Sequence, residues 1–157
     1  MGVIRGSSYY TVVDGPTWSE AQSKAESLGG NLVSFGSKEE ETFVINYAES
    51  ISREAWWWMG MEYDPSISSM KWINGEEYGY ENWYEGSGVK YPEASINLKH
   101  YKYTEFTADP GRNWAGATPS DGPWAIALPT SRRKGIAEVP LSYFSVSDLT
   151  IDEGEKG

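Results

Sequence analysis

Cysteine is absent from this sequence, and histidine occurs only once, as His100. Without cysteine the chain can form no disulfide and offers no thiolate for catalysis or metal binding. A hydrolytic triad would have to use His100, and no G-x-S-x-G segment accompanies it. Residues 111–118 have the glycine spacing of a phosphate loop, but Ala117 stands where the lysine must be. The sequence therefore predicts a protein that is not an enzyme.

Long apolar runs and excess basic charge are missing too. No segment approaches the roughly 20 apolar residues of a membrane span, so we expect no membrane insertion. Lysine and arginine number 13 against 23 aspartates and glutamates, which gives a net charge of −10. Nucleic acid rewards basic patches, so this balance argues against a nucleic-acid partner. Aromatic residues, in contrast, are abundant: eight Trp, eleven Tyr and four Phe make up 15% of the chain. They supply area to small cores and also stack on sugars, and both interpretations stay open.

Capping signals and apolar spacing predict two helices in the first third of the chain. Thr17 to Glu20 has the S/T-x-x-E form of a capping box, and Gly29 with Gly30 ends the helix that follows. Ser37 to Glu40 opens a second helix in the same way. The charged run at 38–41 is interpreted as a first turn complementing the helix dipole.

Strand patterns occupy most of the remainder. They fall at residues 8–13, 31–35, 55–61, 71–73, 95–103 and 134–141. A long segment at 78–121 is rich in Gly, Pro, Tyr and Asn, and loops of that length in a compact domain are usually functional. Two helices followed by several strands predict an α+β fold.

Four segments together resemble the C-type lectin-like domain family. Residues 17–44, TWSEAQSKAESLGGNLVSFGSKEEETFV, are similar to the first half of such domains. WMGM (58–61) resembles the family's "WIGL" strand, KWINGEEYGYENW (71–83) its "WKWVDG…YTNW" segment, and GIAE (135–138) its closing "YICE". The resemblance covers about residues 8–141. It implies two helices flanking small antiparallel sheets, with a long loop excursion that carries the ligand. It also implies a buried core that includes Trp18, Trp58, Trp72 and Trp83.

The family's usual cysteines are replaced in this chain. The resemblance places Ala25 and Ala137 at the positions of one bridge, and Ser95, in PEAS, at the start of a second. Both partners of the first bridge are lost together, as expected where small apolar contact replaces a crosslink.

The family's sugar-chelating calcium site is also altered. Calcium needs about six to eight oxygen ligands. The triplet that usually supplies several of them falls near Ser87, Gly88 and Val89, none of which carries a carboxylate. Only Glu93 matches its ligand position. A relocated site stays open, with Glu93 and Asp121 as its metal ligands. Other oxygen donors of the excursion are Glu85, Asn97, Glu105, Asp109 and Asn113.

Aromatic stacking beside a carboxylate needs no metal, because the ring covers the sugar face while the carboxylate accepts hydroxyl hydrogen bonds. Tyr101 and Tyr103 are further aromatic candidates. We expect ligand binding through the following residues: Tyr84, Glu85, Tyr91, Glu93, Asn113 and Trp114.

The last residues suggest a second module. FSVSDLTIDEGEKG (144–157) resembles the opening strand of a Calx-β domain, a calcium-binding sandwich repeated in bacterial surface adhesins. We therefore expect a lectin-like domain at 1–141 and, at 142–157, a linker and the truncated start of a Calx-β-like domain within a larger bacterial surface protein. The sequence predicts an extracellular recognition module that binds carbohydrate for adhesion. The alternative is a module that binds a cell-surface protein or is structural, without sugar or calcium affinity.

Overall fold

The computed structural model describes residues 1–53, 55–84, 103–108, 122–127 and 130–143. The helices are α1 (Trp18–Ser27), α2 (Lys38–Ile51) and the short 3-10 helix η3 (Leu141–Tyr143). The strands are β1 (Val3–Arg5), β2 (Ser8–Val13), β3 (Asn31–Leu32), β4 (Trp56–Asp64), β5 (Ser69–Trp72), β6 (Tyr103–Thr107), β7 (Trp124–Ile126) and β8 (Lys134–Pro140). In the described part of the chain, neither α-helix has the length and apolar character needed to span a bilayer.

Both predicted helices are present, and each begins directly after its predicted N-cap residue, Thr17 or Ser37. Thr17 accepts the Glu20 N–H and Glu20 returns a carboxylate to the Thr17 N–H, so the first capping box is complete. At the second helix, Ser37 accepts the Glu40 N–H, but the Glu40 carboxylate accepts the N–H of Gly36 at 2.8 Å, one residue before the cap. The second box is therefore only half formed.

One mixed sheet links all the described strands. Its order is β1-β2-β8-β4-β6-β7, with β3 paired to β8 and β5 paired to β4. All pairs are antiparallel except β4 with β8, where Trp57 pairs with Lys134 and Trp58 with Gly135. Residues 31–35 form only a two-residue strand, and β6 begins at Tyr103, where the sequence predicted a strand to end. The predicted residues 95–102 lie outside the described residues.

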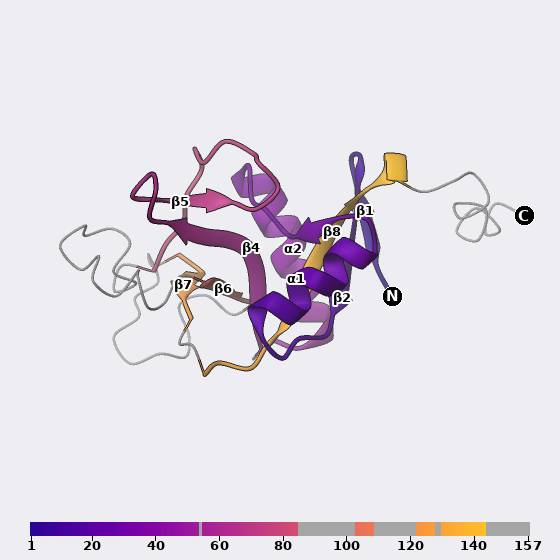
Figure 1. Ribbon diagram of the computed structural model, residues 1–157. Coiled ribbons are helices and arrows are strands. Elements are labelled where there is room, and N and C mark those ends of the chain that lie inside the picture. The colour runs from indigo at the N-terminus through magenta and orange to yellow at the C-terminus, as the bar shows by residue number, and fades with distance from the viewer. Residues whose placement is uncertain (54, 85–102, 109–121, 128–129, 144–157) are drawn as a thin grey trace, which may run out of the picture.

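The two helices cover opposite faces of this sheet. Ile136 of β8 packs in one hydrophobic cluster with Val44 of α2, whereas its neighbour Ala137 packs in a second cluster with Ala21 and Ala25 of α1. Successive residues of a strand point to opposite faces, so the alternation places one helix on each side. Figure 1 shows α1 and α2 on either side of β8, with β5, β6 and β7 at the far end from β1 and η3. The expected α+β fold with two flanking helices is confirmed.

The four expected core tryptophans are buried. Trp18, Trp58, Trp72 and Trp83 are exposed by no more than 6%. Residues 144–157, and with them the expected Calx-β-like strand, lie outside the described residues.

Candidate functional site

Two segments, one on each side of the long excursion, meet at a junction that we call the neck: residues 78–84 and 122–126. Backbone hydrogen bonds join its two segments. The Tyr84 N–H donates to the Trp124 carbonyl at 2.8 Å, and the Trp124 N–H donates to the Asn82 carbonyl at 3.2 Å. The Gly122 N–H donates to the Trp83 carbonyl at 3.4 Å. The two neck segments are therefore held side by side, and between them in the chain β6 returns to the sheet next to β4 and β7.

Gly122 lets these segments approach. A Cβ placed on it would lie 1.9 Å from the carbonyl oxygen of Asn82, which is backbone and cannot move aside alone. The glycine is required by this close approach.

We expect Gly122→Ala to open the neck, because the added methyl group cannot be accommodated without separating the two segments. The loss of unfolding free energy should be about 1–3 kcal/mol, the usual range for an overpacked site. Thermal melting would measure it. Gly79→Ala is a suitable control, since nothing lies within 4 Å of its Cβ position; equal losses in both variants would contradict the close-approach explanation.

An aromatic cluster fills the space beneath the neck. Trp124 is fully buried and stacks on Phe35, with centroids 5.6 Å apart and an interplanar angle of 23°. Its edges meet Trp72 at 5.5 Å, Trp83 at 5.4 Å and Tyr80 at 5.7 Å, all close to perpendicular. Edge-to-face and offset-stacked contacts are the favoured arrangements of such rings. The neck is thus anchored by rings that come from both of its segments, from β5 and from the chain after β3.

Glu41 connects the neck to α2. Its side chain is buried, and Oε1 accepts hydrogen bonds from Asn82 Nδ2 at 2.8 Å and from the Tyr80 hydroxyl at 3.1 Å. Within the described part of the chain, Glu41 Oε2 and Trp124 Nε1 have no hydrogen-bond partner. Burial raises the pKa of Glu41, while the hydrogen bonds of Asn82 and Tyr80 and the nearby Trp124 N–H lower it. The Trp124 N–H is therefore near the carboxylate without meeting the geometry of a direct bond.

Glu39, Glu40 and Glu41 lie in the first turn of α2, as the sequence predicted, but Glu41 is in addition buried, which the sequence interpretation did not anticipate. Glu41, Val44, Tyr47 and Ala48 form the buried face of α2. The spacing of Glu41 from Val44 is the signal that could have identified it, because residues three apart share a helix face.

Of the expected ligand-binding residues, Tyr84 is described. It is half-buried, and it follows Trp83 directly at the point where the first neck segment ends. The remaining expected residues lie outside the described residues: Glu85, Tyr91, Glu93, Asn113, Trp114 and Asp121.

Two candidates of the excursion have structural roles. Glu105 lies in β6, is 6% exposed, and accepts a hydrogen bond from Arg133 Nε at 2.7 Å. A buried carboxylate committed to an arginine is a poor calcium ligand, so its inclusion among the loop oxygen donors was wrong. Tyr103 stacks on Trp18, with centroids 4.4 Å apart and an angle of 10°, and it packs against the core.

A second acidic group lies around Ser34. The Ser34 hydroxyl lies 2.9 Å from Glu76 and 3.3 Å from Glu138, and Tyr10 donates to Glu40 at 2.7 Å. Burial, and then the charges of Glu40 and Glu76, raise the pKa of Glu138. These carboxylates already accept hydroxyl and N–H donors, and no three His, Asp or Glu side chains converge as a metal-binding group in the ranges that the structure describes. The described residues therefore do not fit a calcium ion.

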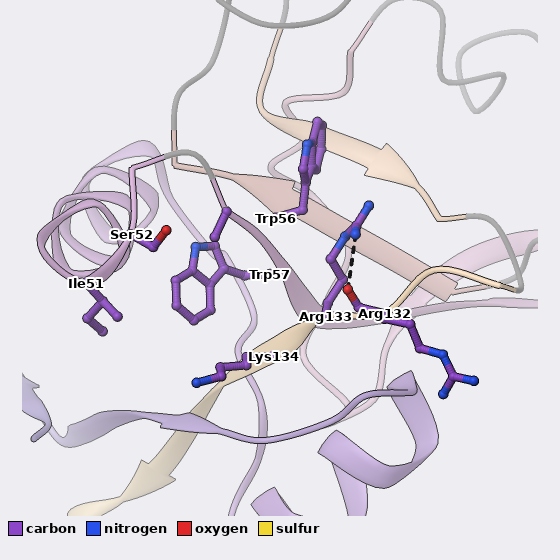
Figure 2. Close-up of a pocket in the computed structure, with 8 residues that line it drawn as sticks. Ile51, Ser52, Trp56, Trp57, Arg132, Arg133 and Lys134 are labelled. Atoms are coloured by element: carbon purple, nitrogen blue, oxygen red, sulfur yellow. Dashed lines mark hydrogen bonds between the residues drawn. The ribbon is translucent and has the colours of Figure 1, made fainter.

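The described surface has a hollow of about 510 Å³ between the end of α2 and the start of β8, and no neck residue lines it. Figure 2 shows Trp57 between Ser52 and Lys134, while the Arg132 side chain points away from them. Arg133, beside Trp56, is already paired with Glu105. The neck, rather than this hollow, joins the predicted loop to the scaffold.

The chain is similar in sequence to curated C-type lectins and snaclecs over more than half of its length. The chain is 32% identical over 94 residues to C-type lectin 16 of Crotalus adamanteus, which is 59% of this chain and 63% of that protein. It is 34% identical over 83 residues to one chain of the snaclec coagulation factor IX/factor X-binding protein of Echis carinatus, 51% of this chain and 66% of that relative. The chain thus spans about half to two thirds of the length of the curated relatives it matches.

Solved structures share the fold at low identity. The C-type lectin CEL-I from Cucumaria echinata superposes with a TM-score of 0.68 at 20% identity, covering 87% of this chain and 93% of that one. SPL-1 in complex with GlcNAc gives 0.67 at 19%, covering 88% and 91%. The Ca2+-independent C-type lectin SPL-2 from Saxidomus purpuratus gives 0.65 at 15%, covering 88% and 90%.

A family model of the lectin C-type domain matches residues 14–114, which include both helices, β4, β5 and the first neck segment. The order of elements, the paired alanines of α1 and β8, and this match agree, and the chain belongs to the C-type lectin domain family.

Proposed function

We propose that this domain is a non-catalytic, extracellular recognition module that binds carbohydrate for adhesion. The observation that carries the proposal is the neck: its hydrogen bonds and its ring cluster provide a rigid base for the excursion from which the expected ligand residues come. Binding residues on loops are most precise where a rigid scaffold positions them. Membership of the lectin family supports a sugar as the ligand.

In this proposal the sugar is bound without a resident metal. Tyr84, Tyr91 and Trp114 supply stacking faces, and Glu85, Glu93 and Asn113 accept or donate hydroxyl hydrogen bonds. A structural neighbour is a lectin named as calcium-independent, which supports this choice. A calcium site at Glu93 and Asp121 is the metal-dependent form of the same proposal.

A second function, recognition of a protein, is favoured by one relative. The snaclec of Echis carinatus is named for binding coagulation factors IX and X, so the family's scaffold is compatible with protein partners. We further propose that residues 142–157 begin a Calx-β-like domain and that the lectin domain is one module of a larger bacterial surface protein.

The test is a high-valency glycan array, run once in millimolar calcium and once in a chelator. Hits under both conditions support metal-free recognition, and hits in calcium alone support the site at Glu93 and Asp121. A folded domain that binds no glycan under either condition would reject the sugar and leave a protein partner.

For any glycan bound, Tyr91→Ala with Trp114→Ala should weaken binding at least about tenfold. Each lost ring contact is worth about 1 kcal/mol, and about 1.4 kcal/mol is tenfold in affinity. Calorimetric titration measures the loss, and melting should be unchanged. Ile67→Ala, an exposed position of the β4–β5 turn, is the control. If the double variant melts markedly lower, these rings belong to the core.

A further inference from the structure

The neck covers a buried carboxyl group, that of Glu41. Glu41 is only 3% exposed, and the groups around its carboxylate are Asn82 and Trp124 of the neck together with Tyr80. All three residues belong to the neck: Tyr80 and Asn82 to its first segment and Trp124 to its second. Separating the segments would remove the cover and return the carboxylate to water.

The surroundings of Glu41 disfavour the charged form of its carboxyl group. Burial raises the pKa of Glu41 above 4.5, and it outweighs the donors that lower it. The titratable groups that act on it are Tyr80 from the neck and Lys38 from the preceding turn of α2. Burial and the charge of Glu41 raise the pKa of Tyr80, so Tyr80 stays a neutral donor. Oε2 also remains without a donor among the described residues.

We propose that Glu41 is a positioning residue of the binding loop that links closure of the neck to uptake of one proton. With the neck open, Glu41 is hydrated and titrates as an ordinary glutamate. With the neck closed, its neutral form is favoured. The closed neck is therefore most stable below the ordinary pKa, and this advantage is lost as the pH rises through the raised pKa of the closed state. The inference concerns the neck itself and holds whichever ligand the loop binds.

Amide hydrogen exchange of the whole chain, followed by NMR, tests this directly. The reporting amides are those of Tyr84, Gly122 and Trp124, which make the neck hydrogen bonds. After correction for intrinsic rates, their protection should fall by up to about tenfold per pH unit as the pH rises from 4.5 through the raised pKa. The Val33 amide, bonded to the Ile136 carbonyl in the sheet, reports unfolding of the whole domain.

Glu41→Gln should remove this pH dependence and keep the neck amides at the protection that the native protein reaches in acid. Tyr80→Phe removes one donor that lowers the pKa of Glu41, so the transition should move to higher pH. Glu49→Gln, on the exposed side of the same helix, should behave as the native protein. His100→Gln removes the single histidine and should leave the dependence intact.

Three results would overturn the proposal. The first is a native neck whose protection does not change with pH. The second is a Glu41→Gln variant whose neck protection still depends on pH. A Glu41→Gln variant with lower neck protection than the native protein at neutral pH counts equally, because it would mean that Glu41 is only a structural hydrogen-bond acceptor. The third, which needs no change at Glu41, is Tyr80→Phe without an upward shift of the transition.

Discussion

Trp124→Ala should destabilise the domain by about 3–5 kcal/mol, the range measured when a fully buried large aromatic side chain is removed. Trp124 is completely buried, and its ring contacts Phe35, Trp72 and Trp83 at centroid distances of 5.4–5.6 Å. These neighbours come from separate parts of the chain, so no single local shift can refill the space. A loss of this size lowers Tm by about 10–15 °C in a chain of this length.

Trp124→Phe is the matched control, because it keeps a ring against Phe35 and removes only part of the indole. In the described part of the chain the Trp124 indole nitrogen makes no direct hydrogen bond, so the substitution should cost about 1–2 kcal/mol, through lost ring contact and loss of the N–H near Glu41. Scanning calorimetry measures both variants. Melting of Trp124→Ala within a degree or two of the native protein would mean that the ring cluster does not anchor the neck.

The features of the fold that could be predicted are those determined by residues close together in the sequence, such as the ends of helices. The first helix ends with the Gly30 N–H bonded to the Ala25 carbonyl at 3.0 Å and the Gly29 N–H to the Glu26 carbonyl at 2.9 Å, with Gly29 at a φ of 93°. Two glycines after a helical pattern predict this ending because the left-handed position costs glycine least. The parallel pairing of Trp57 with Lys134 leaves no such mark, since it joins strands distant in the chain.

The site was harder to predict for a related reason. Glu41 stands among charged neighbours in a first turn, and only the segments that fold over it make it a buried residue. Glu105 is similar: it is a charged residue of β6, but it is buried and paired with Arg133, which is distant in the chain. The charge pattern of a sequence predicts solvent exposure correctly only where no distant segment covers the residue. Tyr84 stays a predicted ligand residue; Asn82 and Trp83, directly before it, are the motif residues that the sequence offers there.

A disulfide engineered between Ala25 and Ala137 should stabilise the domain by about 4 kcal/mol, because it would close a loop of about 110 residues in the unfolded chain. Both side chains are fully buried in one cluster. Their neighbours show how α1 runs along β8: a Cβ on Gly135 would lie 3.3 Å from Ala21 Cβ, and one on Gly30 would meet the Glu138 carbonyl. Ala25 lies between Ala21 and Gly30, and Ala137 between Gly135 and Glu138. The two alanines therefore face each other where the resemblance to the family places a bridge.

Ala25→Cys with Ala137→Cys, oxidised, should melt about 8–16 °C above its own reduced form. Comparing the two redox states of one protein cancels the cost of the substitutions, and Ala25→Cys alone should show no redox effect. Thiol titration decides whether the bond forms. Two free thiols after oxidation would mean that α1 and β8 do not bring these positions within bridging distance. A bond that forms without raising Tm would mean that the unfolded chain is already compact, because the stabilisation arises from restricting that state rather than from a new native contact.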